Sequence, residues 1–516
     1  MAKTLKKRAS KQAYVSQFQL TLPGFETPFS ESLSPNNRWV ILSKQIPWDK
    51  IVHVYQSRMG NDFMGAEGIN PRVAIGALII KHMENFSDRD TVMHIQENIY
   101  MQYFLGYSSF SPEEPFDSSL FVEFRKRLGI EQIEQINDII VELSKESKTR
   151  DKSTEDKQDK GDDNSSDDAN TDVNNQKKIT HKGKLIADAT ACPQDIAYPT
   201  DLNLLNDARV KTEELIDFVY NPSLHKKKPR TDRFEARKLY LRTAQKKKKS
   251  KKEIRKAIKK QLTYLRKNVQ SINRMLDSYE EFPLNNHQHR YLLVVTKLYE
   301  QQQQMYDEKS HSIDDRIVSI HQPHVRPIVR GKANAHTEFG AKIQVCLMNG
   351  FAFLDDLSWD AFNEGNRLIS SVEKYKKRFG YYPEEVLVDK IYCTRENRNK
   401  LKELEIRLRA KPLGRPKAVD VEHVRPGERN PIEGKFGQAK TAYGMNRIKA
   451  RLKNTSESWI ATIVMVLNLV KLAGQVPYCL YLILKDLFSK MLCEINLYRI
   501  LVAKIFFPSF IQSSAC

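Results

Sequence analysis

The sequence predicts an α+β protein, in which an all-α N-terminal unit precedes a mixed domain of strands and helices. Apolar side chains recur at helical spacing through residues 13–145. After a polar stretch, short strand-like runs alternate with further helical patterns, which indicates a mixed domain. The chain has 516 residues, 40% of them hydrophobic, so it can bury a real core, and wholesale disorder is excluded.

Residues 13–145 are expected to form a compact unit of short helices. Pro47 begins one helix, residues 71–83 are apolar at helical spacing, and residues 117–119 are a candidate N-cap for the helix from Leu120. Short helices with polar turns fit a DNA-binding helix-turn-helix unit. On pattern alone, a small helical bundle without a DNA role is the simpler interpretation, because small helices are common.

Residues 146–180 are expected to form a disordered polar linker, because they are mostly Asp, Lys, Ser, Asn and Thr. The mixed domain is expected to cover residues 181–475. Its strand-like runs are residues 185–187, 343–347, 351–354 and 386–388, with a hairpin turn at Asn349-Gly350. Its helical patterns are residues 365–379, 396–404 and 430–439.

A long basic insertion interrupts this domain at about residues 210–315. Residues 242–267 hold 13 Lys or Arg against the single acid Glu253, above a heptad-like apolar stripe that runs from Ile254 to Leu276. We expect an antiparallel helical hairpin with one cationic arm. Such a density of positive charge suits contact with DNA phosphates, although a charge run is often only a solvated face. The candidate phosphate contacts are Lys246, Lys247, Lys248, Lys249, Lys251 and Lys252.

Three acids stand where they could share a metal ion. Asp188 and Asp389 each follow a short apolar strand, and Glu433 lies on a predicted helix between Arg429 and Lys440. Carboxylates that meet from distant positions are what Mg²⁺ requires, and two such ions can drive phosphodiester chemistry. We therefore expect two Mg²⁺ ions at these acids, with Mn²⁺ able to substitute. For any one of these acids alone, a turn or capping role would be the simpler interpretation.

These segments resemble the DDE transposases of bacterial insertion sequences, in the branch with an InsH-type N-terminal domain. The resemblance covers most of residues 13–475 and includes six further segments: 116–120 with 124–128, 338–342, 359–364, 394–398, 412–416 and Tyr443-Gly444. It implies a ribonuclease H-like fold in which Asp188, Asp389 and Glu433 are catalytic metal ligands. Arg429 and Lys440 match the basic members of the family's Tyr-Arg-Glu-Lys signature, whose tyrosine position is Pro426 here.

The resemblance implies a transposase that binds terminal inverted repeats, cleaves one strand at each end and joins the 3′-hydroxyl to target DNA. A domesticated or inactive DNA-binding derivative and a structure-specific nuclease of the same fold are the alternatives. The net charge of +20 favours a polyanion as the partner but does not distinguish nucleic acid from an anionic membrane surface, and an RNA-binding role would suit it equally. The resemblance implies that the partner is double-stranded DNA, and pairing two DNA ends implies a homodimer or larger assembly.

We expect a cytoplasmic, nucleoid-associated protein with reduced thiols. The six cysteines are scattered, and the basic N-terminus lacks an apolar signal region. Residues 476–516 form an apolar tail that carries several charges, so it is expected to pack as a helix rather than to span a membrane.

Overall fold

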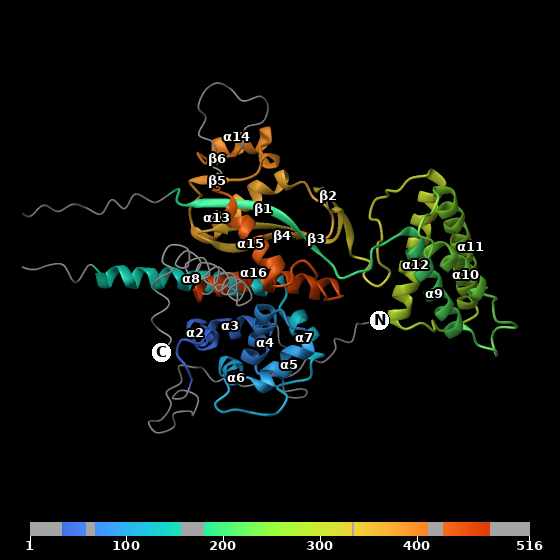
Figure 1. The fold of residues 1–516 in the computed structure, drawn as a ribbon, viewed down its shortest axis with the longest axis horizontal. Coiled ribbons are helices and arrows are strands. Elements are labelled where there is room, and N and C mark those ends of the chain that lie inside the picture. The colour runs from blue at the N-terminus through green and yellow to red at the C-terminus, as the bar shows by residue number, and fades with distance from the viewer. Residues whose placement is uncertain (1–32, 58–67, 156–179, 333–334, 411–426, 475–516) are drawn as a thin grey trace, which may run out of the picture.

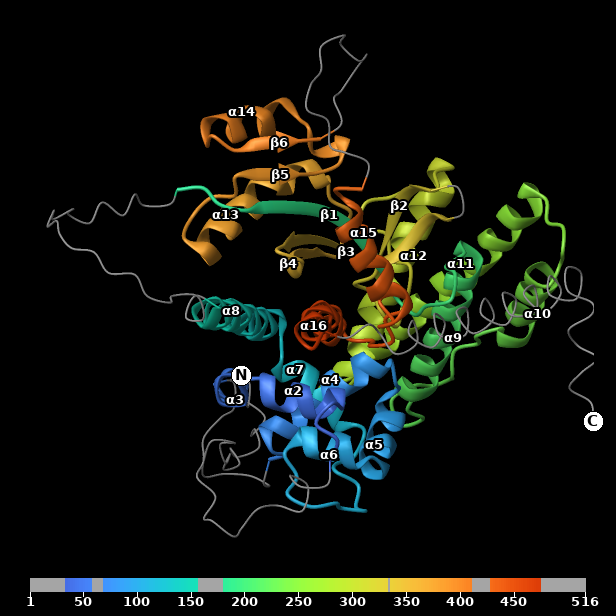
Figure 2. The same ribbon diagram turned by 60° about the vertical axis from the view of Figure 1, so that its left-hand side comes forward.

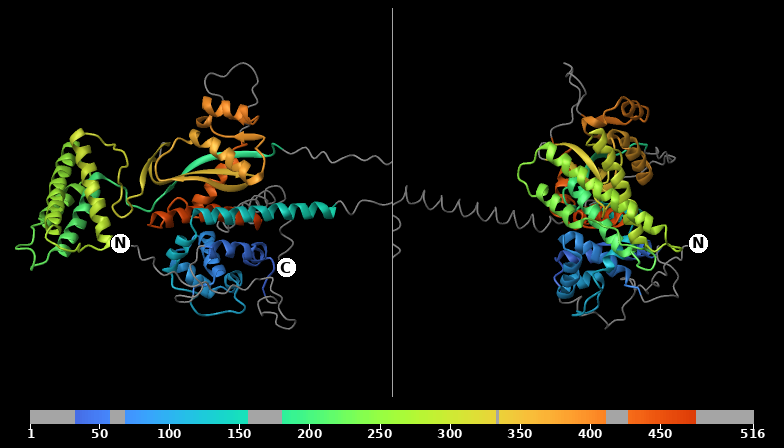
Figure 3. Two further views of the ribbon diagram at one scale, coloured as in Figure 1. Left: turned by 180° about the vertical axis from the view of Figure 1, so that it is seen from behind. Right: turned by 90° about the vertical axis from the view of Figure 1, so that its right-hand side faces the viewer.

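The computed structural model describes residues 33–57, 68–155, 180–332, 335–410 and 427–474, and the α+β expectation is confirmed (Figure 1). A curled mixed sheet lies above a layer of two long helices, and a group of shorter helices lies below that layer. A separate group of four helices stands beyond one end of the sheet, as Figure 2 and Figure 3 also show. The predicted C-terminal tail and the linker from residue 156 lie outside the described residues.

The N-terminal part is all helical, as predicted. The helices expected at Pro47, at residues 71–83 and at Leu120 are all present. Their bounds are α2 (Arg38–Gln45), α3 (Trp48–Gln56), α4 (Pro71–Glu84), α5 (Asp88–Glu97), α6 (Ile99–Leu105), α7 (Leu120–Arg127) and α8 (Ile130–Glu155).

Helix α8 continues past residue 146, where the sequence predicted the disordered linker to begin, and ends at Glu155. The prediction rested on the lack of apolar side chains. That lack indicates that the segment cannot pack into a core, but it does not prevent the segment from forming a helix. Once a helix is nucleated, each further residue adds a backbone hydrogen bond, and Glu and Lys are good helix formers.

The sheet has six strands, and its central strand is β1 (Lys184–Pro193). On one side β1 pairs in parallel with β5 (Glu385–Leu387), which pairs in parallel with β6 (Arg407–Arg409). On the other side it pairs antiparallel with β3 (Ala335–Met348), whose far edge carries β2 (Arg326–Lys332) and β4 (Phe351–Ser358). The predicted hairpin between β3 and β4 is confirmed, and both of its turn residues, Asn349 and Gly350, have positive φ.

Helices cover both faces of the sheet. One face packs against α13 (Leu368–Phe379), η2 (Lys390–Tyr392) and α14 (Arg395–Glu403), and η1 (Glu364–Arg367) contacts α13 and η2. The other face packs against α15 (Asn430–Thr441) and α16 (Lys453–Leu472). These bounds confirm the three helical patterns predicted after the hairpin.

Helix α16 joins the sheet to the N-terminal helices, because it packs against β4 on one side and against α4, α7 and α8 on the other. Its length and composition alone would allow it to span a membrane, but 83% of its apolar window is buried inside the protein. It is therefore built like the core helix of a globular protein.

The basic insertion is a module of four helices: α9 (Asp201–Val219), α10 (Arg233–Ala244), α11 (Lys251–Leu276) and α12 (Asn286–Glu308). The predicted antiparallel pair is present as α11 and α12, and the stripe of α11 is buried against α9 and α12. The predicted start at residue 210 was wrong, because α9 begins at Asp201. The helical stripe of α9 had not been recognised in the sequence.

Candidate active site

Asp188 lies in the middle of the sheet's central strand. The sequence placed it at the end of a strand, which was wrong, because Ala189 to Cys192 continue the pairing of β1 with β3. These small residues are buried and give β1 no reason to stop. The side chain of Asp188 is only 18% exposed.

Asp389 comes from the neighbouring parallel strand. Ile186 of β1 pairs with Leu387 of β5, so Asp188 and Asp389 both lie two residues beyond this pair. Asp389 has left the strand and caps η2, where its Oδ1 accepts a hydrogen bond of 2.7 Å from the amide of Lys390. The predicted position at the end of a strand is therefore confirmed for Asp389.

Arg429 joins the two aspartates. It is the N-cap residue of α15, which packs across β1. One guanidinium nitrogen lies 3.4 Å from Oδ2 of Asp188, and the other lies 3.2 Å from Oδ1 of Asp389. The side chain of Arg429 is only 20% exposed and that of Asp188 18%, so the pair between these two residues is shielded from solvent more than an ordinary surface pair.

Negative charge is concentrated around Asp188. Burial raises the pKa of Asp188, and the charges of Glu364 and Asp389 raise it further, against the lowering effects of an amide hydrogen bond and of Arg429. Glu364 itself pairs with Lys342 of β3 at 2.9 Å. The sequence did not single out Glu364 or Lys342 as site residues. The only sign of them was their place in two of the segments that carry the resemblance.

Glu433 and Lys440 lie on the same helix as Arg429, as their spacing predicted. Glu433 is exposed, and within the described part of the chain it has no hydrogen-bond or ion-pair partner. Lys440 is half-buried. The structure thus brings Asp188, Asp389 and Arg429 into contact, and it leaves Glu433 one turn further along α15 without a contact to either aspartate.

The donor set suits a hard divalent cation. One carboxylate on β1 and one in the turn that follows β5 face one cationic group, so the protein already places a positive charge between them. Among the described residues, no three His, Cys, Asp or Glu side chains lie close enough to hold one metal ion. A complete ligand set would therefore need a third carboxylate to move in, and the unpaired Glu433 is available for this.

The six predicted phosphate-binding lysines are all exposed. The sequence predicted that they belong to one cationic arm of a helical hairpin. Lys246 to Lys249 lie in the turn between α10 and α11, and Lys251 and Lys252 begin α11. Lys246 pairs with Glu253, and Lys249 donates a hydrogen bond to the carbonyl of Ala244. The other four, Lys247, Lys248, Lys251 and Lys252, have no partner within the described residues.

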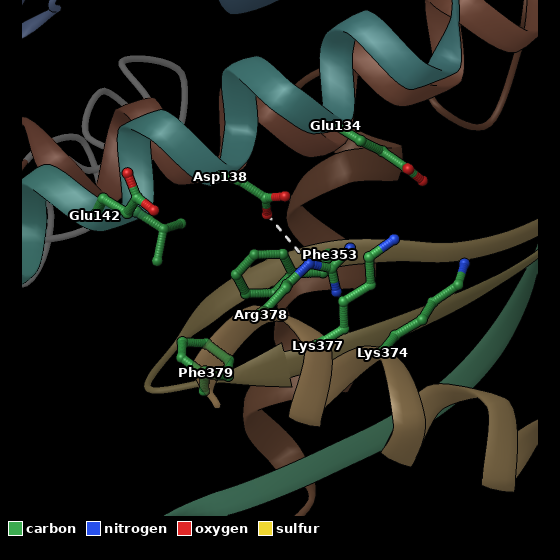
Figure 4. Close-up of a pocket in the computed structure, with 9 residues that line it drawn as sticks. Glu134, Asp138, Glu142, Phe353, Lys374, Lys377, Arg378 and Phe379 are labelled. Atoms are coloured by element: carbon green, nitrogen blue, oxygen red, sulfur yellow. Dashed lines mark hydrogen bonds and ion pairs between the residues drawn. The ribbon is translucent and has the colours of Figure 1, made fainter. Parts of the chain in front are cut away.

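A cavity of about 330 Å³ lies elsewhere, between α8 and α13 (Figure 4). Acidic side chains of α8 face basic side chains of α13 across it, and Arg378 bonds Asp138 at 3.1 Å. Burial raises the pKa of Glu134 on its wall. None of the candidate site residues lines this cavity, so it belongs to the contact between α8 and the sheet.

Two family models match the chain. Residues 386–470 match a transposase DDE domain, and residues 28–127 match the transposase domain DUF772. The first match contains Asp389, Arg429, Glu433 and Lys440, and the second covers most of the N-terminal helices. Over these two regions the chain is similar to domains found in transposases.

A curated relative is the uncharacterized protein ORF8 in the nfe locus of Rhizobium meliloti, which is 29% identical over 119 residues. The match spans 23% of this chain and 56% of that protein's length. No solved structure matches the chain.

Proposed function

We propose that this protein is a divalent-metal-dependent DDE transposase that cleaves the ends of its insertion sequence and joins them to target DNA. The observation that carries the proposal is the convergence of Asp188 and Asp389 on Arg429. Asp389 and Arg429 lie inside the region that resembles a transposase DDE domain, and β1 brings Asp188 to them from outside it. Paired carboxylates beside a cation are what phosphodiester chemistry on a polyanion requires.

Asp188, Asp389 and Glu433 would hold the metal ions, Mg²⁺ or in its place Mn²⁺. Bound there, the ions would supply Lewis-acid activation of the attacking oxygen and charge stabilisation of the leaving one. Asp188 is fixed by the sheet and Asp389 by its turn, so both are preorganised, whereas the exposed Glu433 completes the set from α15. Arg429 and Lys440 lie on the same helix and would hold the phosphate backbone at the site.

The finer parts of the proposal follow the resemblance. We assign the mixed sheet to the ribonuclease H-like fold, the chain to the InsH-type branch and residues 429–440 to the Tyr-Arg-Glu-Lys signature. The N-terminal helices and the lysines of the insertion would bind double-stranded DNA. The active complex would be a homodimer or larger, because two DNA ends must be brought together, and it would act in the cytoplasm at the nucleoid.

Asp389→Ala tests the catalytic assignment. We expect the variant to bind DNA that carries the element's ends but to cleave neither strand in Mg²⁺ or Mn²⁺, because the change removes a metal ligand and leaves the phosphate-binding side chains in place. The readout is strand cleavage on denaturing gels beside binding by mobility shift. Asp195→Ala is the matched control, because Asp195 follows β1 and its carboxylate pairs, among the residues that the structure describes, with the exposed Arg447 alone.

Full cleavage by pure Asp389→Ala protein would refute the assignment. Wild-type protein that cleaves but never joins ends would identify the structure-specific nuclease. Wild-type protein that binds DNA but neither cleaves nor binds Mn²⁺ would identify the inactive derivative.

A further inference from the structure

Asp389 lies in an irregular turn at the protein surface, so something beneath it must hold its position. Its side chain is 52% exposed. The turn is closed by two short-range bonds, from the amide of Tyr392 to the carbonyl of Asp389 and from the amide of Cys393 to the carbonyl of Lys390, each 3.1 Å long. A turn of this kind has no ladder of strand hydrogen bonds to fix it relative to β1.

The side chain of Asn397 holds this turn by a buried hydrogen bond. It lies in the first turn of α14 and is 4% exposed. Its Nδ2 donates one hydrogen bond of 2.8 Å to the carbonyl of Tyr392 and another of 2.7 Å to the carbonyl of Gly365. Both amide hydrogens are therefore used, and each one holds a different turn.

The two turns are in tight contact where Asn397 joins them. Gly365 belongs to η1, the segment of Glu364. A Cβ atom at Gly365 would lie 3.0 Å from the carbonyl oxygen of Ile391, so this contact leaves almost no room for a side chain. The carboxamide of Asn397 thus sets the spacing of the Glu364 segment and the Asp389 segment.

Tyr392 connects the Asp389 turn to the sheet. Its side chain is fully buried, and its hydroxyl donates a hydrogen bond of 2.9 Å to Oε1 of Gln344. Gln344 is fully buried in β3, where it pairs with Ala189, the residue that follows Asp188. A continuous path of hydrogen bonds therefore leads from Asn397 through Tyr392 to the strand that pairs with Asp188.

We propose that Asn397 is a positioning residue of the metal site, which holds the Asp389 turn in register with Asp188 through Tyr392 and Gln344. The inference rests on the proposed function and names a residue that touches neither metal nor DNA. Its physical basis is that a ligand held by buried hydrogen bonds loses little freedom when a metal binds. These hydrogen bonds do not involve Arg429, so they persist when Arg429 binds a phosphate instead of the two aspartates.

The test compares Asn397→Ala with Thr394→Val in the full chain. Thr394 caps the same helix, where its Oγ1 accepts a bond from the amide of Asn397, but it makes no bond to the Asp389 turn. Both variants weaken α14, so both are expected to lower the thermal midpoint. Only Asn397→Ala should weaken Mn²⁺ binding, by about tenfold or more in calorimetric titration, with DNA affinity in EDTA unchanged.

Mn²⁺ affinities of Asn397→Ala and Thr394→Val within twofold of each other would overturn the inference. If Asn397→Ala does not fold, Tyr392→Phe replaces it, because that change removes only the bond to Gln344. It should weaken Mn²⁺ binding in the same direction, and a wild-type affinity would count against the inference. Asp389→Ala serves as the reference for loss of the site: if wild type binds Mn²⁺ no better than this variant, the proposed function itself fails.

Discussion

The close approach of Asp188 and Asp389 depends on Arg429. Two carboxylates that approach one point repel each other unless a cation lies between them. The guanidinium of Arg429 supplies that cation, at 3.4 Å from Asp188 and 3.2 Å from Asp389. It therefore stabilises the arrangement of the two carboxylates, and in the proposed metal site its positive charge would compete with a metal ion for them.

Replacing Arg429 should separate metal binding from DNA binding. In Arg429→Gln we expect Mn²⁺ to bind several-fold more tightly in the absence of DNA, because the competing positive charge is gone. DNA should bind more weakly, because the variant has one fewer cation to pair with a phosphate. Calorimetry and a mobility-shift titration measure the two effects. Lys440→Gln removes the same charge from the same helix and should weaken DNA binding only, whereas weaker Mn²⁺ binding in Arg429→Gln would contradict this account.

At the scale of residues, the sequence was informative where the chemistry is local. It placed Asp389 correctly after an apolar strand and put Arg429, Glu433 and Lys440 on one helix. It could not reveal Asn397, Gln344 or the Lys342–Glu364 pair, because these act through bonds between segments that are distant in the chain. Spacing along one element carries no information about such contacts.

Among the elements, α16 depends on one buried polar network. Asn468 of α16 accepts a bond from the amide of Ala352 in β4 and donates bonds to the carbonyl of Ala352 and to Asn137 of α8, each 2.7 Å long. All three residues are buried. The network ties the sheet, α16 and the N-terminal helices together at one point, so each bond is shielded from water.

Asn468→Leu should therefore destabilise the protein by about 2 to 3 kcal/mol, because it leaves the buried amide of Ala352 and the Oδ1 of Asn137 without their partners. The measurement is the free energy of unfolding in urea. Thr462→Val is the control on the same helix, because it removes a single bond to the Ser458 carbonyl and keeps the side-chain shape. It should cost about 1 kcal/mol or less, and an equal loss in the two variants would argue against the network.

Periodicity predicted most helices and the β3–β4 hairpin, because these depend on local patterns. It predicted two helices in the insertion where there are four, since α9 and α10 lack a stripe as regular as that of α11. It also ended β1 too early, because the two alanines after Asp188 have little strand preference of their own and are held by pairing with β3.

In the molecule as a whole, the sheet and the N-terminal helices share one hydrophobic core through α16. Trp459 of α16 shows the contact in detail, since Lys81 and Arg125 of the N-terminal helices lie over its ring at 4.5 Å and 4.9 Å. The sequence divided the chain at its polar stretch and gave no sign of this contact, because the residues involved are more than 300 positions apart. The insertion, in contrast, has its own apolar clusters.

That separate module carries the densest positive charge of the described chain, and its four unpaired lysines should determine how DNA binding responds to salt. Each lysine that no longer neutralises a phosphate lowers the slope of log K against log salt by about 0.9. Neutralising Lys247, Lys248, Lys251 and Lys252 together to Gln should therefore flatten the slope by up to about 3.6. Titrations at four or more salt concentrations on one duplex measure this, with cleavage of pre-bound DNA as the second readout.

The control removes charge from the body of the protein, at the exposed Lys377 and Lys402, which lie on α13 and α14 away from the module. If the module is the DNA contact, this pair should change the slope much less per charge than the four lysines do, because a surface charge away from the phosphates releases no condensed counterions. An unchanged slope in the fourfold variant would show that the lysines are only a solvated face. DNA binding would then rest on the N-terminal helices and on α15 alone, and the net charge of +20 would act only as a long-range attraction.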